Sequence, residues 1–94
     1  MRIIGFIWLD HFIDKLEQKH QVDAFEAEAI FQQDALIKRA EKGHRPGENV
    51  YAAYGQTEAG RYLVVFFVYK ADKRALIISA HDMTQAERRL YGQR

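Results

Sequence analysis

The residues best suited to chemistry lie in the last third of the chain, where cationic groups stand beside apolar runs. Arg61 precedes the run 62–69, His81 follows the run 75–80, and Arg88 comes shortly afterwards. Reactions at a phosphate group need a base, an acid and cations that stabilise charge developing on phosphorus. Histidine titrates near neutrality, and arginine presents a planar fork to phosphate oxygens. The pattern indicates a protein that presents Arg and His on a sheet to a polyanion.

Antiparallel strand pairing would bring these residues together. Strands are expected at residues 49–56, 61–69 and 74–80, with short hairpin connections at 58–60 and 70–73. The start of one antiparallel strand lies beside the end of the next, so we expect Arg61, His81 and Arg88 in one patch. The alternative is a solvated sheet edge with incidental cations.

The N-terminal half supplies elements that can cover this sheet. Residues 3–8 form an apolar, β-branched and aromatic run that predicts a first strand. Asp10 is the expected N-cap of an amphipathic helix over residues 11–20, with Phe12, Ile13 and Leu16 on its apolar side. The strand 61–69 is apolar on both faces, which places it at the centre of the sheet with two helices on one side.

A second helix begins after Asp23, where Glu26 completes a capping box. Its buried stripe is either Phe25, Ala29 and Ile30 or Ala27, Ile30 and Phe31. Residues 35–37 predict a brief strand that runs into Lys38-Arg39, and residues 42–47 predict a basic loop around the sole proline. Thr84 and Glu87 form another capping box for a short final helix that reaches Tyr91. The predicted fold class is therefore α+β.

Further candidates for RNA contact lie outside the central patch. Lys19 and His20 end the first helix, where cations also serve as a purely structural cap for the helix dipole, and a place beside Arg61 would favour catalysis by His20. His44 and Arg45 can grip an RNA backbone or simply form solvated surface. Tyr91 can stack an unpaired base, although aromatics make up 13% of the chain and most of them belong to the core.

Composition bounds the remaining possibilities. The 94 residues predict a single domain, and 48% hydrophobic with 29% charged residues is the balance of a packed protein. Fourteen Lys and Arg against thirteen Asp and Glu leave a formal charge of +1, so attraction to nucleic acid must come from local clustering. The chain has no cysteine, which excludes disulfides, a thiolate nucleophile and sulfur-ligated zinc. The four histidines show no metal-ligand spacing, so we expect no metal and no cofactor.

The sequence also predicts a location. The opening apolar run is ended by Asp10 and His11 before a signal peptide is complete, and no segment approaches the ~20 apolar residues of a membrane span. Together with the missing cysteines, this pattern is typical of a cytoplasmic protein that does not enter membranes.

One set of residues, in order and spacing, resembles the BrnT toxins of bacterial type II toxin–antitoxin pairs. These residues are Trp8, Lys19-His20, Glu26-Ala27, Phe31, Gly55, Gly60-Arg61, Ile77-Ile78-Ser79-Ala80, Glu87-Arg88 and Tyr91. The resemblance covers nearly the whole chain. It implies a RelE-like fold, in which a small antiparallel sheet packs against two N-terminal helices, plus a short C-terminal helix. It further implies metal-independent RNA cleavage that arrests translation, and neutralisation by a cognate antitoxin protein.

The chain departs from that family at expected arginine positions. Members usually carry arginine where this chain has His81 and Leu76, and an arginine common ahead of the middle strand falls near Asn49 or Val50. These departures leave open an alternative function, a catalytically inactive RelE-like module that binds an antitoxin or RNA. Because such a partner would cover apolar and basic surface together, we also expect the isolated protein to form a homodimer through that face.

Overall fold

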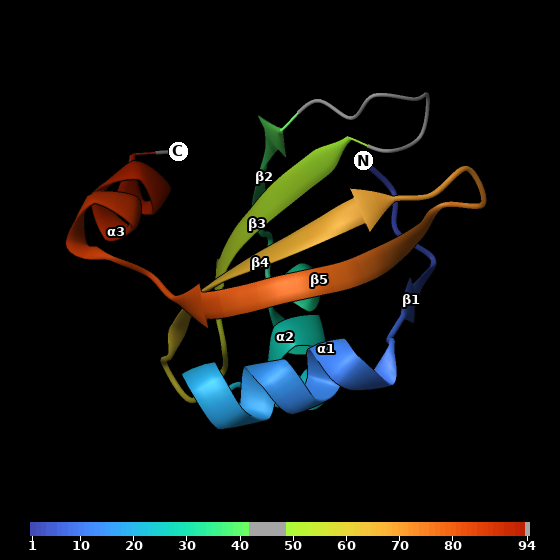
Figure 1. Cartoon of the computed structure of the whole chain (residues 1–94). Helices are drawn as coiled ribbons and strands as arrows, with labels where there is room; N and C mark the ends of the chain where they lie inside the picture. Colours follow the sequence, from blue (N-terminus) through green and yellow to red (C-terminus); the bar gives the residue numbers. More distant parts are fainter. Residues whose placement is uncertain (42–48, 94) are drawn as a thin grey trace.

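The computed structural model describes residues 1–41 and 49–93 and shows one five-stranded sheet with helices on both of its faces (Figure 1). The elements in chain order are β1 (Gly5–Ile7), α1 (Asp10–Lys15), the π-helical turn η1 (Leu16–His20), α2 (Ala24–Ala29), the 3-10 turn η2 (Ile30–Gln32), β2 (Leu36–Glu41), β3 (Val50–Gln56), β4 (Tyr62–Tyr69), β5 (Arg74–Asp82) and α3 (Gln85–Gly92). The predicted loop at 42–47, with His44 and Arg45, lies outside the described residues.

The strand order β1-β5-β4-β3-β2 places β4 at the centre of the sheet, as its two apolar faces predict. The pairs β2–β3, β3–β4 and β4–β5 are antiparallel. By contrast β1 runs parallel to β5, with Gly5 opposite Arg74, and it has three residues instead of the six expected. A parallel neighbour is possible here because the helices and three strands intervene between β1 and β5 in the chain. The expected α+β class is confirmed.

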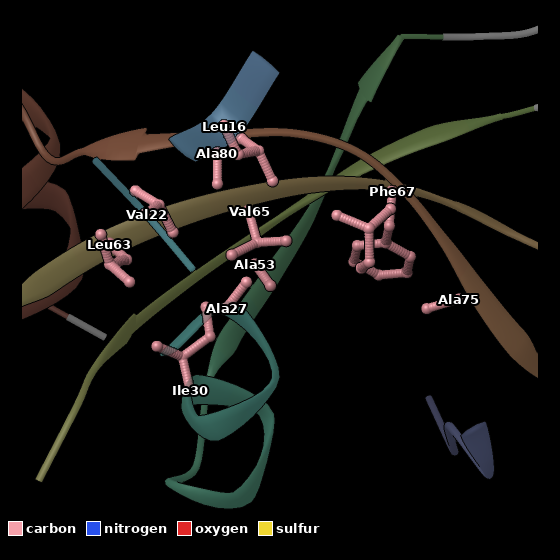
Figure 2. Close-up of a cluster of buried hydrophobic side chains, with 11 residues drawn as sticks. Leu16, Val22, Ala27, Ile30, Ala53, Leu63, Val65, Phe67, Ala75 and Ala80 are labelled. Atoms are coloured by element: carbon pink, nitrogen blue, oxygen red, sulfur yellow. The ribbon is translucent and has the colours of Figure 1, made fainter. Parts of the chain in front are cut away.

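The two faces of β4 contribute to two separate apolar clusters. Leu63, Val65 and Phe67 are fully buried against the helical elements, in a cluster that also holds Leu16, Val22, Ala27 and Ile30 (Figure 2). Val64 lies on the opposite face with Ala52, Met83 and Tyr91, the last of which belongs to α3. Alternating side chains of one strand therefore join α1 and α2 to one face and α3 to the other.

The first helix differs from its prediction at both ends. Its N-cap is Leu9, which makes no side-chain capping bond, and Asp10 is the first helical residue; the predicted Asp10 cap is wrong. As a first-turn acid, Asp10 still interacts favourably with the helix dipole. From Leu16 the helix widens into π geometry, and of the described residues 10–20 Leu16 alone is fully buried.

The second helix resolves the choice between two apolar stripes. The capping box of Asp23 and Glu26 is confirmed, with Glu26 N donating to the Asp23 carboxylate over 2.8 Å. Ala27 and Ile30 are buried, whereas Phe25 is 83% exposed. The 3-10 turn η2 that follows α2 packs close to β3, since a Cβ on Gly55 would lie 2.7 Å from the Ile30 Cβ. Glycine at position 55 permits that approach.

Two strands extend beyond their predicted C-terminal ends. β2 covers Leu36–Glu41 instead of a brief strand at 35–37 that runs into Lys38-Arg39, because it pairs along β3 from Leu36 onward. β5 continues to Asp82, so His81 belongs to the strand itself. The capping box of Thr84 and Glu87 is confirmed at the start of α3. Within the described ranges, no helix is long and apolar enough to cross a membrane.

Candidate active site

The residues singled out in the sequence gather at one end of the sheet. There β4 begins, β5 ends, η1 ends and α3 follows, all on the left side of Figure 1. Arg61, His81 and Arg88 lie at the same end of the sheet, as predicted. They do not form the single patch that was expected. Arg61 lies on the face covered by α1 and α2, whereas His81 and Arg88 contact residues of the face covered by α3.

Arg61 is held by a network of hydrogen bonds. Its Nε and Nη2 donate to the two carboxylate oxygens of Asp82 over 2.7 and 3.2 Å. Its Nη1 donates to Glu26 Oε1 over 3.0 Å and to the backbone carbonyl of Gln21 over 2.8 Å, and Nη2 also donates to the carbonyl of His20 over 3.1 Å. The side chain is 25% exposed. Its guanidinium therefore joins β5, α2 and the end of η1.

The network stabilises an unusual backbone conformation. Gln21 follows η1 with φ 50° and ψ 39°, in the left-handed region that residues other than glycine rarely adopt. That conformation turns the chain toward α2 and presents carbonyls that the helix itself cannot satisfy. The Arg61 guanidinium can bind these carbonyls as well as the carboxylates because its five N–H donors reach several oxygens at once.

The charges in this network shift the ionisation of its members. The hydrogen bond to Asp82 is the largest cause of a raised pKa for Arg61; burial opposes it and the bond to Glu26 adds to it. The same bond lowers the pKa of Asp82 despite partial burial. The charges of His81 and His20 lower the Asp82 pKa further. Asp82 is thus the link between the two groups of candidate residues.

His81 and Glu87 form a hydrogen-bonded pair on the α3 face. The Nε2 atom of His81 lies 3.1 Å from Glu87 Oε1, and the two side chains are 31% and 23% exposed. The His81 ring also packs on Phe66, with 5.6 Å between ring centroids. An imidazole held against a carboxylate is an arrangement that fixes ring orientation and suits proton transfer.

Glu87 serves two neighbours at once. Its Oε1 accepts the Thr84 N–H over 2.8 Å, which completes the helix cap, and the same carboxylate binds His81. Burial raises the pKa of Glu87, but the bonds from Thr84 and His81 outweigh burial and the net shift is downward. Burial and, secondly, the charge of Glu87 raise the pKa of Tyr54 nearby. The start of α3 and the orientation of His81 therefore depend on one carboxylate.

Arg88 takes part in a different kind of contact. Its guanidinium carbon lies 4.1 Å from the centroid of the Tyr62 ring, in cation–π geometry. Tyr62 in turn meets Tyr91 edge to face, with centroids 6.2 Å apart. Of the ion pairs between described residues, none involves Arg88.

The other predicted contact residues have varied surroundings. Lys19 is exposed on η1, and His20 is partly buried with its carbonyl bound to Arg61. Tyr91 is 9% exposed and belongs to the apolar cluster on the α3 face, so its ring is mainly a core group. Within the described part of the chain, no group of three or more His, Cys, Asp or Glu side chains is arranged to hold a metal ion.

Three acidic residues of this site were not expected to have a role beyond capping. Asp82 was not singled out at all, and Glu26 and Glu87 were predicted only as helix caps. The signal that could have found Asp82 is its position next to His81, because the residue that follows on a strand points to the opposite face, where Arg61 lies.

A family model described as the ribonuclease toxin BrnT of type II toxin–antitoxin systems matches residues 9–87. The chain belongs to the BrnT family. Its structure is similar to the crystal structure of the Brucella abortus ribonuclease toxin BrnT, with a TM-score of 0.63 and 17% sequence identity over 87% of this chain and 99% of that chain. At that identity the similarity shows the BrnT fold. The search of curated proteins found no match.

Membership in the BrnT family confirms the resemblance drawn from the sequence. The matched range 9–87 includes Arg61, His81 and Glu87 and ends just before Arg88. The BrnT fold agrees with the mainly antiparallel sheet, in which only β1 among the described strands runs parallel to its neighbour, and with the two N-terminal helices and the short C-terminal helix.

Proposed function

We propose that this BrnT family member is a metal-independent endoribonuclease that acts in the cytoplasm, cuts RNA and thereby inhibits translation, and that a cognate antitoxin protein neutralises it. The observation that carries the proposal is the hydrogen bond between His81 and Glu87 at the sheet end where Arg88 also lies. This arrangement offers a titratable ring for proton transfer, a carboxylate that orients the ring and a cation for the phosphate, and the reaction uses such groups.

The reaction begins with the 2′-hydroxyl of the RNA. Its oxygen forms a bond to the adjacent phosphorus and gives up its proton to a base, while the bond from phosphorus to the 5′-oxygen breaks and that oxygen takes a proton from an acid. His81 is the proposed proton-transfer residue. Arg88 is the proposed cation that binds the phosphate, because its guanidinium lies over the Tyr62 ring and is not paired with a carboxylate of the described residues.

We propose supporting roles for Arg61 and His20. The guanidinium of Arg61 already binds two carboxylates and two carbonyls, so phosphate would have to displace these partners. We assign Arg61 as a positioning residue that holds Asp82, and with it the end of β5 that carries His81. His20 contributes a second titratable ring close to Asp82, and Lys19 adds a cation on the exposed side of η1.

The test is induced expression in bacteria of the wild-type chain, His81→Ala and the control His11→Ala. His11 is exposed on α1, away from the proposed site. We expect growth arrest and loss of intact RNA with the wild type and His11→Ala, and normal growth with His81→Ala. Purified protein should cut RNA in the presence of a chelator. Normal growth and intact RNA with folded wild-type protein would contradict the proposal and favour a module that only binds.

The predicted homodimer is a separate proposal. Large apolar side chains exposed on the described surface are Met1, Ile4, Leu9 and Phe25. Such groups favour association when they meet a complementary surface. Light scattering on the purified chain checks the mass in solution, and a monomer across the micromolar range would contradict the dimer.

A further inference from the structure

The α3 face carries a cleft that the acid–base pair does not occupy. Its volume is about 620 Å³, within the range of roughly 300–1,000 Å³ that is usual for small-ligand sites. Six of the residues that form it are Tyr62, Met83, Gln85, Arg88, Arg89 and Tyr91. The described lining contains two arginines and no carboxylate. Because the whole chain has a formal charge of only +1, this is a local concentration of positive charge.

The geometry of Arg88 suggests what fills the cleft. One face of its planar guanidinium covers the Tyr62 ring, 4.1 Å from the centroid, and the side chain is exposed to solvent. The second face of the plane is then open to another flat group. Unpaired bases stack on arginine planes and on aromatic rings in single-strand RNA sites, and they do so with little regard to sequence.

The other polar groups fit the rest of a nucleotide. Arg89 is exposed at the same cleft and can meet a phosphate, since its guanidinium fork matches two phosphate oxygens. Gln85 offers both an amide donor and a carbonyl acceptor, which can pair with the edge of a base. A base, a phosphate and a hydrogen-bonding edge are thus each matched by a side chain in the cleft.

We propose that this cleft is a nucleotide subsite for single-stranded RNA, in which a base stacks on the Arg88–Tyr62 pair and a neighbouring phosphate binds Arg89. The inference deepens the proposed ribonuclease function and rests on it for the identity of the ligand. His81 packs on Phe66 and the cleft is lined by Tyr62, and both aromatic residues belong to the α3 face of β4, so the cleft and the proposed proton-transfer group share one face of the sheet. The subsite would therefore hold a nucleotide close to the scissile phosphate.

The experiment measures binding without cleavage. The probe is a fluorescein-labelled 2′-O-methyl RNA of about six nucleotides, a length within the site sizes of single-strand binders. Its blocked 2′-oxygen cannot attack phosphorus, so anisotropy reports affinity alone. The proteins are the wild type, Arg88→Ala, Arg89→Ala and the control Arg74→Ala, which removes a cation at the opposite end of β5.

We expect Arg88→Ala to weaken binding about tenfold, in the range reported for loss of one base stack. Arg89→Ala should reduce the slope of log affinity against log salt by about 0.7, the value for one phosphate contact on a single strand. Arg74→Ala should change neither quantity. Equal affinity for the wild type and Arg88→Ala would overturn the subsite, as would an equal loss in Arg74→Ala or no binding by the wild type.

A second variant of Arg88 distinguishes the contribution of base stacking to affinity from the contribution of the positive charge. Arg88→Lys keeps the positive charge but lacks the flat guanidinium face. The wild type should bind the probe more tightly than an otherwise identical abasic strand, and Arg88→Lys should bind the two strands equally. Circular dichroism confirms that each variant is folded.

Failure of the subsite and failure of the proposed function give different results. If the wild type binds the probe through Arg88 but does not cut RNA, the function fails and the subsite stands. If the wild type cuts RNA and Arg88→Lys still discriminates against the abasic strand, the subsite fails and the function stands.

Discussion

Two arginines at the same end of the sheet have opposite surroundings. Arg61 on the helical face donates to Glu26, to Asp82 and to the carbonyls that follow η1. Arg88 on the α3 face lies over Tyr62 and is exposed. A guanidinium whose donors are satisfied by the protein stabilises the fold, whereas one that retains solvent contact can bind a ligand. Residue type and position at a strand end do not distinguish these two cases.

Two described clefts repeat this contrast. The cleft beside α3 is lined by Arg88 and Arg89, while a second cleft of about 510 Å³, between α2 and the β3–β4 turn, is lined by Glu26, Glu58 and the exposed Phe25. The arginines attract a polyanion to the first cleft, whereas the carboxylates of the second offer it no such attraction. These charges favour the α3 face as the place where the proposed RNA substrate binds.

Arg61→Ala should cause the largest loss of stability. Hydrogen bonds to charged groups contribute about 1.5–3 kcal/mol, and removal of Arg61 leaves Glu26 and the carbonyl of Gln21 without this donor, so we expect unfolding free energy to fall by about 2–3 kcal/mol. Urea denaturation measures the change.

The matched control for that variant is Arg74→Ala. Arg74 pairs with Asp72 in an exposed turn, and such pairs contribute about 0–1 kcal/mol. If Arg61→Ala costs no more than Arg74→Ala, the helical face does not depend on Arg61 and the contrast between the two faces is lost.

Two substitutions of Glu87 distinguish its effect on the stability of α3 from its effect on proton transfer by His81. Glu87→Ala removes both the helix cap and the partner of His81, and the cap alone predicts a loss of about 1 kcal/mol. Glu87→Gln keeps an oxygen for the Thr84 N–H but removes the charge beside His81. We expect Glu87→Gln to be nearly as stable as the wild type and to shift the pH dependence of RNA cleavage. An unchanged pH profile would assign Glu87 to capping alone.

Acid should weaken the helical face through Asp82. Its folded-state pKa is lowered by Arg61, so its contribution to stability is present above the unfolded value near 4 and is lost as pH falls through the lower folded value. Asp82 is 62% exposed, and we expect an effect below about 1 kcal/mol. Urea midpoints at pH 6 and below pH 4 test this in the wild type and Arg61→Ala. The same acid-induced loss in both proteins would show that Arg61 is not its cause.

Phe25→Ser should have the smallest effect. The side chain is 83% exposed, and exposed substitutions usually change stability by within about 0.5 kcal/mol. We also expect unchanged affinity for the 2′-O-methyl probe, because Phe25 lies on the acidic cleft. A clear loss of affinity would place RNA on the helical face. A loss of self-association alone would instead connect Phe25 to the proposed dimer.

Local patterns predicted much of the fold. The capping boxes of Asp23 with Glu26 and of Thr84 with Glu87 depend on residues three apart, and both are present. The central position of β4 followed from its apolar residues on both faces. The first helix was predicted less well, since its π turn and the left-handed Gln21 depend on distant partners such as Arg61.

The sequence by itself determined the periodicities, the capping signals and the residue set that marks the BrnT family, because these depend on near neighbours and on order along the chain. It also determined that Arg61, His81 and Arg88 stand at the ends of pairing strands or just beyond. Only the tertiary structure decided that Arg61 and His81 lie on opposite faces and that Glu26 and Asp82 engage Arg61. The face of the sheet that a side chain occupies depends on the register in which the strands pair. The hydrogen-bond partners of Arg61 are also distant in the chain, since Asp82 and Glu26 lie 21 and 35 positions away.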